Sequence, residues 1–133
     1  MTKISLDTNI LIYNHGINGD TKQLIADSLL DKVPVISTQV ISEYLNVIRR
    51  ISKMNKGDLL KLCAEWLEYC QVQPVCLSTI KLACDLVQKY DFQLFDSIIV
   101  ASALEAECDI LYSEDLHHGL IVENKLTILN PFA

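Results

Sequence analysis

Four acidic side chains stand beside apolar segments of this chain, where an isolated carboxylate is out of place. Asp7 directly follows the first short apolar run, and Asp115 follows a later one by two residues. Asp96 is the third letter of LFDSIIVAS, and Glu43 lies within ISEYLNV. In an open parallel sheet, ligands bind beyond the carboxyl ends of the strands, which is where Asp7 and Asp115 would lie. The placement of these acids predicts a shared site.

Carboxylates gathered in such a site would repel one another. Two of them about 5 Å apart cost roughly 3 kcal/mol at an effective dielectric constant of about 20. A divalent cation relieves this repulsion, and oxygen ligands without a cysteine or histidine set favour Mg²⁺ or Mn²⁺ over zinc. Such an ion can generate hydroxide from bound water and stabilise both oxygens of an in-line displacement at phosphorus. The acids therefore predict metal-assisted hydrolysis of a phosphodiester bond.

Each acid also has an ordinary structural interpretation. Asp7 and Asp115 can form turns or cap helices, as most aspartates after strands do. Asp96 can cap a helix, although the apolar residues three and four positions on place it at the edge of a buried face. Glu43 can face solvent, although no lysine or arginine lies three or four residues away. A buried ionised carboxylate costs several kcal/mol unless a positive charge compensates it.

Short apolar runs alternate with helical periods along the chain, and these elements would position the acids. Strands are expected at 3–6, 34–37, 74–77, 109–113 and 126–129. Helices are expected from Asp20, from Thr38 to a break at 55–57, across 59–70, from Ser78 to about Tyr90, and over 95–108. Strands separated by helices pair in parallel through crossover connections. The sequence predicts an α/β fold whose central parallel sheet has about five strands and helices on both faces.

Length and composition limit the class of protein. With 133 residues, half of them hydrophobic, the chain is expected to form one domain over residues 1–133. No apolar run is long enough to span a bilayer or to act as a secretion signal, so we expect a cytoplasmic protein without membrane contact. Five cysteines, an odd number without CxxC spacing, fit the reduced thiols of that compartment.

The charge of the chain restricts how it could contact nucleic acid. A net charge of -6 argues against wrapping nucleic acid by bulk electrostatics. The basic cluster Arg49, Arg50, Lys53 and Lys56 places four positive charges in eight residues with no acid among them. It can be the solvated end of a helix, or it can guide phosphates or dock an acidic partner. Any contact with nucleic acid must therefore be local.

Taken in order, these motifs resemble the PIN domain family. The resemblance is carried by DTNIL at 7–11, ISEYLNV at 41–47 and FDSIIVASALEAECDILYSED at 95–115, and it covers essentially the whole chain. DTN alone is common, whereas the ordered acids within a matching βα pattern are specific. The resemblance is closest to VapC-type toxins, the ribonucleases of toxin–antitoxin pairs. It implies a Mg²⁺-dependent endoribonuclease, with Mn²⁺ as a substitute, that hydrolyses RNA through a metal-activated water.

The resemblance also assigns roles to individual residues. The four acidic positions of the family are filled by Asp7, Glu43, Asp96 and Asp115, which would bind metal directly or through water. Thr8, Asn9 and Ser113 would orient water or a ligand beside them. Glu114 could replace Asp115, although the S-x-D spacing from Ser113 favours Asp115. Arg49, Arg50, Lys53 and Lys56 are candidates for contact with RNA or a partner.

Partners follow from the same resemblance. It implies a homodimer and a VapB-like antitoxin whose segment crosses the acidic groove, where an arginine would imitate the charge of the metal. Two alternatives remain within the fold: a housekeeping nuclease of RNA processing, and a non-catalytic scaffold that binds RNA or protein. The usual sign of a scaffold is a missing acid, and all four acids are present.

Two other classes place acids at strand ends, and both lack a required residue here. A phosphatase of the haloacid dehalogenase type needs a second aspartate two residues after the first, where Asn9 stands. A response-regulator receiver needs an aspartate after the third strand, where residues 77–79 are Leu-Ser-Thr. The sequence therefore favours the nuclease.

Overall fold

A mostly parallel sheet forms the centre of the molecule. The computed structural model of the protein describes residues 1–17 and 19–133. Its strands are β1 (Ile4–Leu6), β2 (Val35–Ser37), β3 (Gln71–Gln73), β4 (Ile110–Tyr112), β5 (Ile121–Val122) and β6 (Leu126–Leu129). They follow the order β3-β2-β1-β4-β6-β5, and only the β5–β6 pair is antiparallel. The expected α/β class with a central parallel sheet is confirmed.

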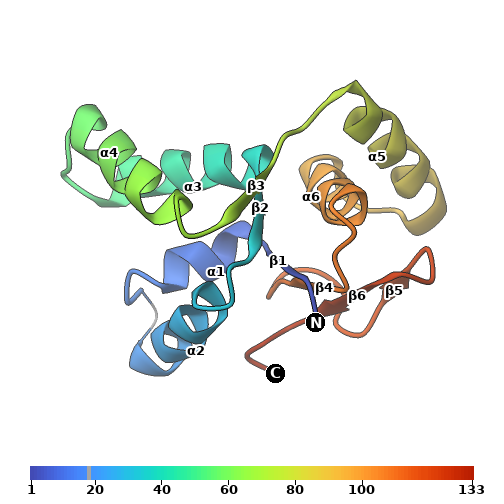
Figure 1. The fold of residues 1–133 in the computed structure, drawn as a ribbon, viewed down its shortest axis with the longest axis horizontal. Coiled ribbons are helices and arrows are strands. Elements are labelled where there is room, and N and C mark those ends of the chain that lie inside the picture. The colour runs from blue at the N-terminus through green and yellow to red at the C-terminus, as the bar shows by residue number, and fades with distance from the viewer. Residues whose placement is uncertain (18) are drawn as a thin grey trace.

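Helices cover both faces of this sheet. They are α1 (Thr8–Tyr13), α2 (Asp20–Leu30), α3 (Thr38–Ile51), α4 (Lys56–Leu67), α5 (Leu77–Tyr90) and α6 (Leu94–Glu105). Helices α1 and α2 lie on one side of the strands, and α5 and α6 lie on the other (Figure 1). In the described part of the chain, no helix is both long enough and apolar enough to cross a membrane. The arrangement follows from the parallel pairing, since each crossover must pass over one face.

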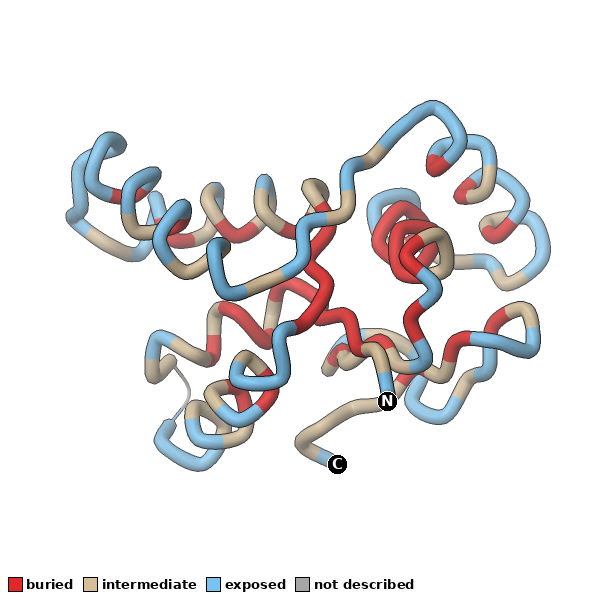
Figure 2. Tube along the Cα trace, viewed as in Figure 1, coloured by how far each residue is buried: buried red, intermediate tan, exposed pale blue. Residues whose placement is uncertain are grey.

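Helix α6 explains why the segment LFDSIIVAS is so apolar. Every residue from Ser97 to Ala103 is buried, because α6 packs against α5, α3 and β2. Burial is concentrated in α6 and in the central strands (Figure 2). A helix that is apolar on all sides belongs in a core. Asp96 lies in the first turn of this helix, where the buried segment meets the surface.

The strand expected at 74–77 is wrong, since the chain pairs three residues earlier. Strand β3 lies at the edge of the sheet and pairs only with β2, with Val72 opposite Ile36. Both Gln71 and Val72 are exposed, so this strand needs no apolar alternation. Pro74 has no N–H to continue the ladder. The apolar residues after Pro74 instead lead into α5, which is capped by Cys76 and not by Ser78.

Two short elements are absent from the expectations. The sequence predicts a polar turn after Leu6, whereas α1 begins directly at Thr8. With six residues, α1 is too short to show a helical period. The two-residue strand β5 adds an antiparallel edge beside β6. Helix α1 begins at the carboxyl end of β1, with Asp7 as its cap.

Candidate active site

The ends of strands β1 and β4 bring Asp7 and Ser113 together. Leu6 is paired with Tyr112 in the parallel register, so both strands end at the same edge. The Asp7 amide donates a hydrogen bond to the Tyr112 carbonyl at 2.9 Å. The Ser113 hydroxyl donates to Oδ2 of Asp7 at 2.7 Å. Residues 106 positions apart in sequence therefore meet at the carboxyl edge of the sheet.

Asp7 is buried, and its surroundings disfavour its charge. The side chain is 4% exposed, and its Oδ1 accepts a hydrogen bond from the Thr8 amide at 2.7 Å, which caps α1. Burial, together with the charges of Asp96 and Glu43, raises the pKa of Asp7 to about 6, although the hydrogen bonds from Ser113 and Thr8 oppose this shift. Asp7 thus caps a helix, as its structural interpretation predicts, and is also a perturbed carboxylate.

Glu43 is aimed toward α1. Helix α3 begins directly after β2, with Ser37 as its cap, so its first turns lie at the same edge of the sheet. The Thr8 hydroxyl donates to Oε1 of Glu43 at 3.0 Å, and Nε2 of Gln39 donates to Oε2 at 2.9 Å. Glu43 is half-buried rather than turned to solvent. Gln39 is a site residue that the sequence analysis missed, and its position four residues before Glu43 could have indicated it.

Asp96 comes to the other acids from helix α6, and the charges of Glu43 and Asp115 act on it. The cap of α6 is Gln93, so the capping interpretation of Asp96 is wrong. Burial raises the pKa of Asp96, and the charges of Glu43 and Asp115 add to this effect. Among residues 1–17 and 19–133, no lysine or arginine forms an ion pair with Asp96. Its carboxylate is therefore left without a positive partner from the described chain.

Asp115 completes the group from the loop after β4. Its Oδ2 accepts a hydrogen bond from Nδ2 of Asn9 at 3.0 Å, and its amide donates to Oγ of Ser113 at 3.2 Å. Asp115 is exposed, unlike the buried Asp7. Its charge reaches Asp96, whose pKa it helps to raise. Asn9 and Ser113 therefore fix the position of the most accessible of the four acids.

Glu114, the alternative to Asp115, is occupied elsewhere. Its carboxylate accepts hydrogen bonds from the Tyr13 hydroxyl and from Nζ of Lys22, the latter at 2.6 Å. Burial would raise the pKa of Glu114, but these two hydrogen bonds outweigh it and lower the pKa. Lys22 thus neutralises Glu114. This arrangement favours Asp115 as the fourth acid.

The donor set suits a hard cation. In the described residues the ion pairs are Lys22–Glu114 and Lys89–Glu123, and neither includes the four acids. No three acid, histidine or cysteine side chains in the described chain are grouped closely enough to enclose a metal by themselves. Mg²⁺ usually keeps several waters and takes only one or two carboxylates. Asp7 and Asp96 could hold such an ion directly, with Glu43 and Asp115 acting through water.

The basic cluster lies away from the acids but on a shared helix. Arg49 and Arg50 are in the last turn of α3, whereas Lys56 begins α4, and all three are exposed. Arg49 and Lys56 line a hollow of about 420 Å³ between the two helices. Glu43 lies on the same helix, in the half of α3 nearer its first residue. The cluster is therefore a separate surface beside the acidic site.

Known structures share this fold. A toxin–antitoxin complex from Klebsiella pneumoniae aligns with a TM-score of 0.71 and 19% identity over 98% of each chain. The VapC20 toxin of Mycobacterium tuberculosis, described as cleaving the sarcin–ricin loop, aligns with a TM-score of 0.66 and 17% identity over 85% of this chain and 92% of that one. VapBC2 from Rickettsia felis aligns with a TM-score of 0.63 and 17% identity over 86% and 89%. At such identities the likeness shows the fold.

Family membership is established by the sequence itself. No curated protein matches the chain. The family described as PIN domain matches residues 4–120, which contain all four acids. Because this match covers most of the chain, the protein belongs to the PIN domain family.

Proposed function

We propose that the protein is a Mg²⁺-dependent endoribonuclease and the toxin of a type II toxin–antitoxin pair. The observation that carries the proposal is the state of Asp7, a buried carboxylate whose pKa is raised to about 6 beside the charges of Asp96 and Glu43. A group of carboxylates that concentrates negative charge without a neighbouring cation among the described residues is suited to a metal ion. Membership of the PIN family supports the same reading.

The side chains around the acids provide positioning. When bound, Mg²⁺ or Mn²⁺ would lower the pKa of a bound water and offset charge on the phosphate. Ser113 fixes Asp7, Thr8 fixes Glu43, and Asn9 fixes Asp115, each through a hydrogen bond. Preorganised ligands of this kind need not rearrange when a cation or a phosphate arrives. No protein nucleophile is required, and the products would carry 5′-phosphate and 3′-hydroxyl ends.

An RNA strand fits this site better than a small phosphate ester does. The acids lie at an open sheet edge, and Asp115 is exposed, so a long substrate can cross without threading. The basic cluster on α3 and α4 (Arg49, Arg50, Lys53 and Lys56) offers local contacts that the net charge of -6 does not. The VapC20 toxin with this fold is described as cleaving the sarcin–ricin loop. We expect such a ribonuclease to act in the cytoplasm.

A VapB-like antitoxin is the proposed protein partner. Several proteins with this fold were solved as toxin–antitoxin complexes. In this chain, an acidic site without a neutralising side chain among the described residues would accept an arginine from such a partner. Growth arrest on expression, relieved by co-expression of the gene next to this one, would support the pairing. Arrest that this neighbour does not relieve favours a housekeeping nuclease.

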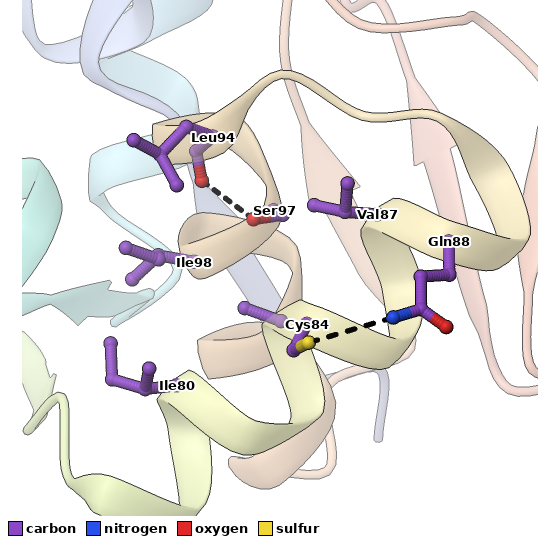
Figure 3. Close-up of a pocket in the computed structure, with 8 residues that line it drawn as sticks. Ile80, Cys84, Val87, Gln88, Leu94, Ser97 and Ile98 are labelled. Carbon is purple, nitrogen blue, oxygen red and sulfur yellow. Dashed lines mark hydrogen bonds between the residues drawn. The ribbon is translucent and has the colours of Figure 1, made fainter.

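A homodimer is proposed through the apolar face of α5 and α6. Four large apolar side chains there are at least 46% exposed: Leu77 69%, Ile80 46%, Leu94 67% and Phe95 57%. A hollow of about 290 Å³ opens between the two helices, with Ile80 and Val87 on one side and Leu94 and Ile98 on the other (Figure 3). Exposed apolar surface of this kind marks an interaction site.

Cleavage of RNA by matched acid variants tests the proposed function. Purified protein with Mg²⁺ should cut single-stranded RNA, and a chelator should stop it. Asp96→Asn should lower the rate by at least about a hundredfold, since even groups that only support a metal ligand change activity by that order. Glu114→Gln, which weakens the contact with Lys22 but leaves all four acids in place, should lower the rate far less, by about tenfold at most. The readout is the rate at which a labelled oligonucleotide is cleaved.

The alternatives give different outcomes. A non-catalytic scaffold would bind RNA equally with or without the Asp96→Asn change and would cut none. Retained metal-dependent cleavage by both Asp7→Asn and Asp96→Asn proteins would refute the assigned site. If Glu114→Gln removes activity and Asp115→Asn does not, then Glu114 is the fourth acid.

A further inference from the structure

We propose that Arg49 and Arg50, both anchored on Asn46, bind a backbone phosphate of the substrate strand. This phosphate would lie about three nucleotides from the bond that is cut. This inference rests on the proposed ribonuclease function. It makes helix α3 a track that begins at the acids and ends at a pair of guanidinium groups. The other two members of the basic cluster, Lys53 and Lys56, are not part of this pair.

Asn46 ties the two arginines to one place. Nη2 of Arg49 donates a hydrogen bond to Oδ1 of Asn46 at 2.8 Å. Nε of Arg50 donates to the Asn46 carbonyl at 3.3 Å. Successive residues of a helix point about 100° apart, so two neighbouring arginines would ordinarily diverge. Here both side chains reach back along α3, toward the end that carries Glu43.

The spacing along α3 matches a strand of RNA. Arg50 follows Glu43 by seven residues, which is close to two helical turns, so both side chains leave from the same face. At about 1.5 Å per residue the two positions lie roughly 10 Å apart along the axis. A stacked strand advances about 3.4 Å per nucleotide, so this distance corresponds to about three nucleotides.

Both guanidinium groups keep donors for a phosphate. A guanidinium carries five N–H donors in a planar fork that matches phosphate oxygens, and each arginine uses one of them on Asn46. Within the chain as described, neither Arg49 nor Arg50 forms an ion pair, and both are exposed. Because Asn46 already holds both arginine side chains, they would lose less conformational entropy when a phosphate binds.

Two other roles for this pair predict different behaviour. Cations in the last turn of a helix stabilise its dipole, and this role predicts a loss of stability without a change in RNA affinity. Docking of an acidic protein segment predicts a change in partner affinity only. The phosphate role is favoured because Arg50 shares a helix face with Glu43, Arg49 is drawn to Asn46 beside it, and the proposed substrate of the adjacent site is itself a polyanion.

Affinity and its salt dependence test the proposal without requiring cleavage. A labelled ten-nucleotide oligouridylate is titrated by fluorescence anisotropy in buffer without divalent ions. The double variant Arg49→Gln/Arg50→Gln should bind on the order of tenfold more weakly, and the slope of log affinity against log salt should fall by about 0.7 for each phosphate that the variant no longer neutralises. Asn46→Ala, which keeps all charges, should bind more weakly than the wild type with an unchanged slope.

A matched control separates local contacts from overall charge. Lys32→Gln/Lys125→Gln removes two exposed positive charges elsewhere and should change affinity much less. Thermal unfolding of each variant reports the helix-dipole role separately. The proposal is overturned if the arginine variant binds RNA with the wild-type affinity and slope, or if the control variant is weakened as much. It is equally overturned if the arginine change abolishes binding of an acidic peptide and leaves RNA binding intact.

Substrate length distinguishes this proposal from the proposed function. In the presence of Mg²⁺, KM is measured on oligonucleotides shortened stepwise on either side of the cut. Arg49→Gln/Arg50→Gln should raise KM on long substrates but not on those that end within about two nucleotides of the cut on one side. If no substrate is cleaved by the wild type, the ribonuclease function fails while the binding result stands. If the arginine change raises KM equally on oligonucleotides of every length, the proposed phosphate contact is overturned while the ribonuclease function is not.

Discussion

At the scale of single residues, Asp7 has an observed structural role and a proposed functional one, and these roles oppose each other. As the cap of α1 it gains a hydrogen bond from the Thr8 amide, which stabilises the helix. As a member of the acidic group it is buried beside like charges, which destabilises its ionised form. In the proposed site a cation would offset the second effect. Asp7 would then link stability to pH and to metal.

The pH dependence of stability follows from this link. Folding raises the pKa of Asp7 from 3.8 to about 6, so the folded state holds the proton more tightly than the unfolded state does. The stability from this proton is present below the unfolded pKa and is lost as pH rises from about 4 to about 6. Without metal, ionised Asp7 should cost at most about 3 kcal/mol at neutral pH, since one pKa unit is about 1.4 kcal/mol.

Asp7→Asn removes this cost and can be compared directly with the wild type. In chelator, the variant should unfold at higher denaturant than the wild type at pH 7.5, and this advantage should shrink toward zero near pH 4. The substituted asparagine would still cap α1, so the helix is retained. Saturating Mg²⁺ should stabilise the wild type more than the variant. An advantage that does not change with pH would contradict the shifted pKa.

Site residues differ in how far the sequence could reveal them. The four acids were indicated by their position beside apolar segments and by their match to family motifs, and three of them change the pKa of a neighbour in the structure. Gln39 had a helical-spacing signal that went unused. The contact between Lys22 and Glu114 had no signal in the sequence, because 92 residues separate the two. Long-range polar contacts on exposed residues leave no local pattern.

At the scale of elements, a cluster between α1, α2 and the loop after β4 holds that loop in place. Lys22 of α2 pairs with Glu114 and lies 4.5 Å from the ring centroid of Tyr13 and 5.2 Å from that of Phe132. The two rings meet edge to face at 5.2 Å. The loop held in this way also carries Asp115. The cluster therefore connects the first helices and the C-terminal segment to the site.

Breaking this cluster should affect catalysis more than stability. Lys22→Met removes the ion pair with Glu114, and because the pair is partly exposed the free energy of unfolding should change by less than about 1 kcal/mol. The rate of RNA cleavage should fall on the order of tenfold, since a small displacement of a positioned group such as Asp115 costs that much or more. Single-turnover kinetics and chemical denaturation check the two effects.

The pair Lys89–Glu123 provides the control for this prediction. It is also a partly exposed ion pair, but it joins α5 to the turn before β6, outside the acidic group. Lys89→Met should therefore change stability by a similar small amount and leave the cleavage rate unchanged. Equal rates for the two variants would show that the cluster around Lys22 does not position Asp115.

Elements were predictable where burial imposes a pattern. Strands β1, β2, β4 and β6 and helices α2 to α6 were expected near their observed positions, because their apolar faces pack into the core. Strand β3 was misplaced because an edge strand with exposed glutamines has no apolar period. Helix α1 was missed because its six residues follow directly from β1 without a separating turn. Short and exposed elements depend on their neighbours rather than on their own sequence.

At the scale of the whole molecule, three kinds of surface are built from different residues, although α3 carries both Glu43 and the arginines and α6 carries both Asp96 and two of the apolar side chains. The acids lie at the carboxyl edge of the sheet, the arginines at the end of α3, and the apolar side chains on α5 and α6. A chain with a net charge of -6 can therefore still offer a polyanion a local positive contact. Because the three surfaces have no residue in common, the proposed substrate and a second copy of the chain would not compete for the same residues.

The apolar face of α5 and α6 predicts how the protein assembles into a dimer. Stable interfaces bury about 800 Å² on each partner around an apolar centre, and exposed Ile80 lies at the mouth of the hollow between these helices. Ile80→Glu would place a charge at that centre, so the protein should sediment as a monomer where the wild type is a dimer. Ile121→Glu makes the same change at a similarly exposed position on β5, so that variant should remain dimeric. Sedimentation equilibrium of the three proteins decides the matter, because a monomeric wild type, or an Ile80→Glu protein that still dimerises, excludes this face as the interface.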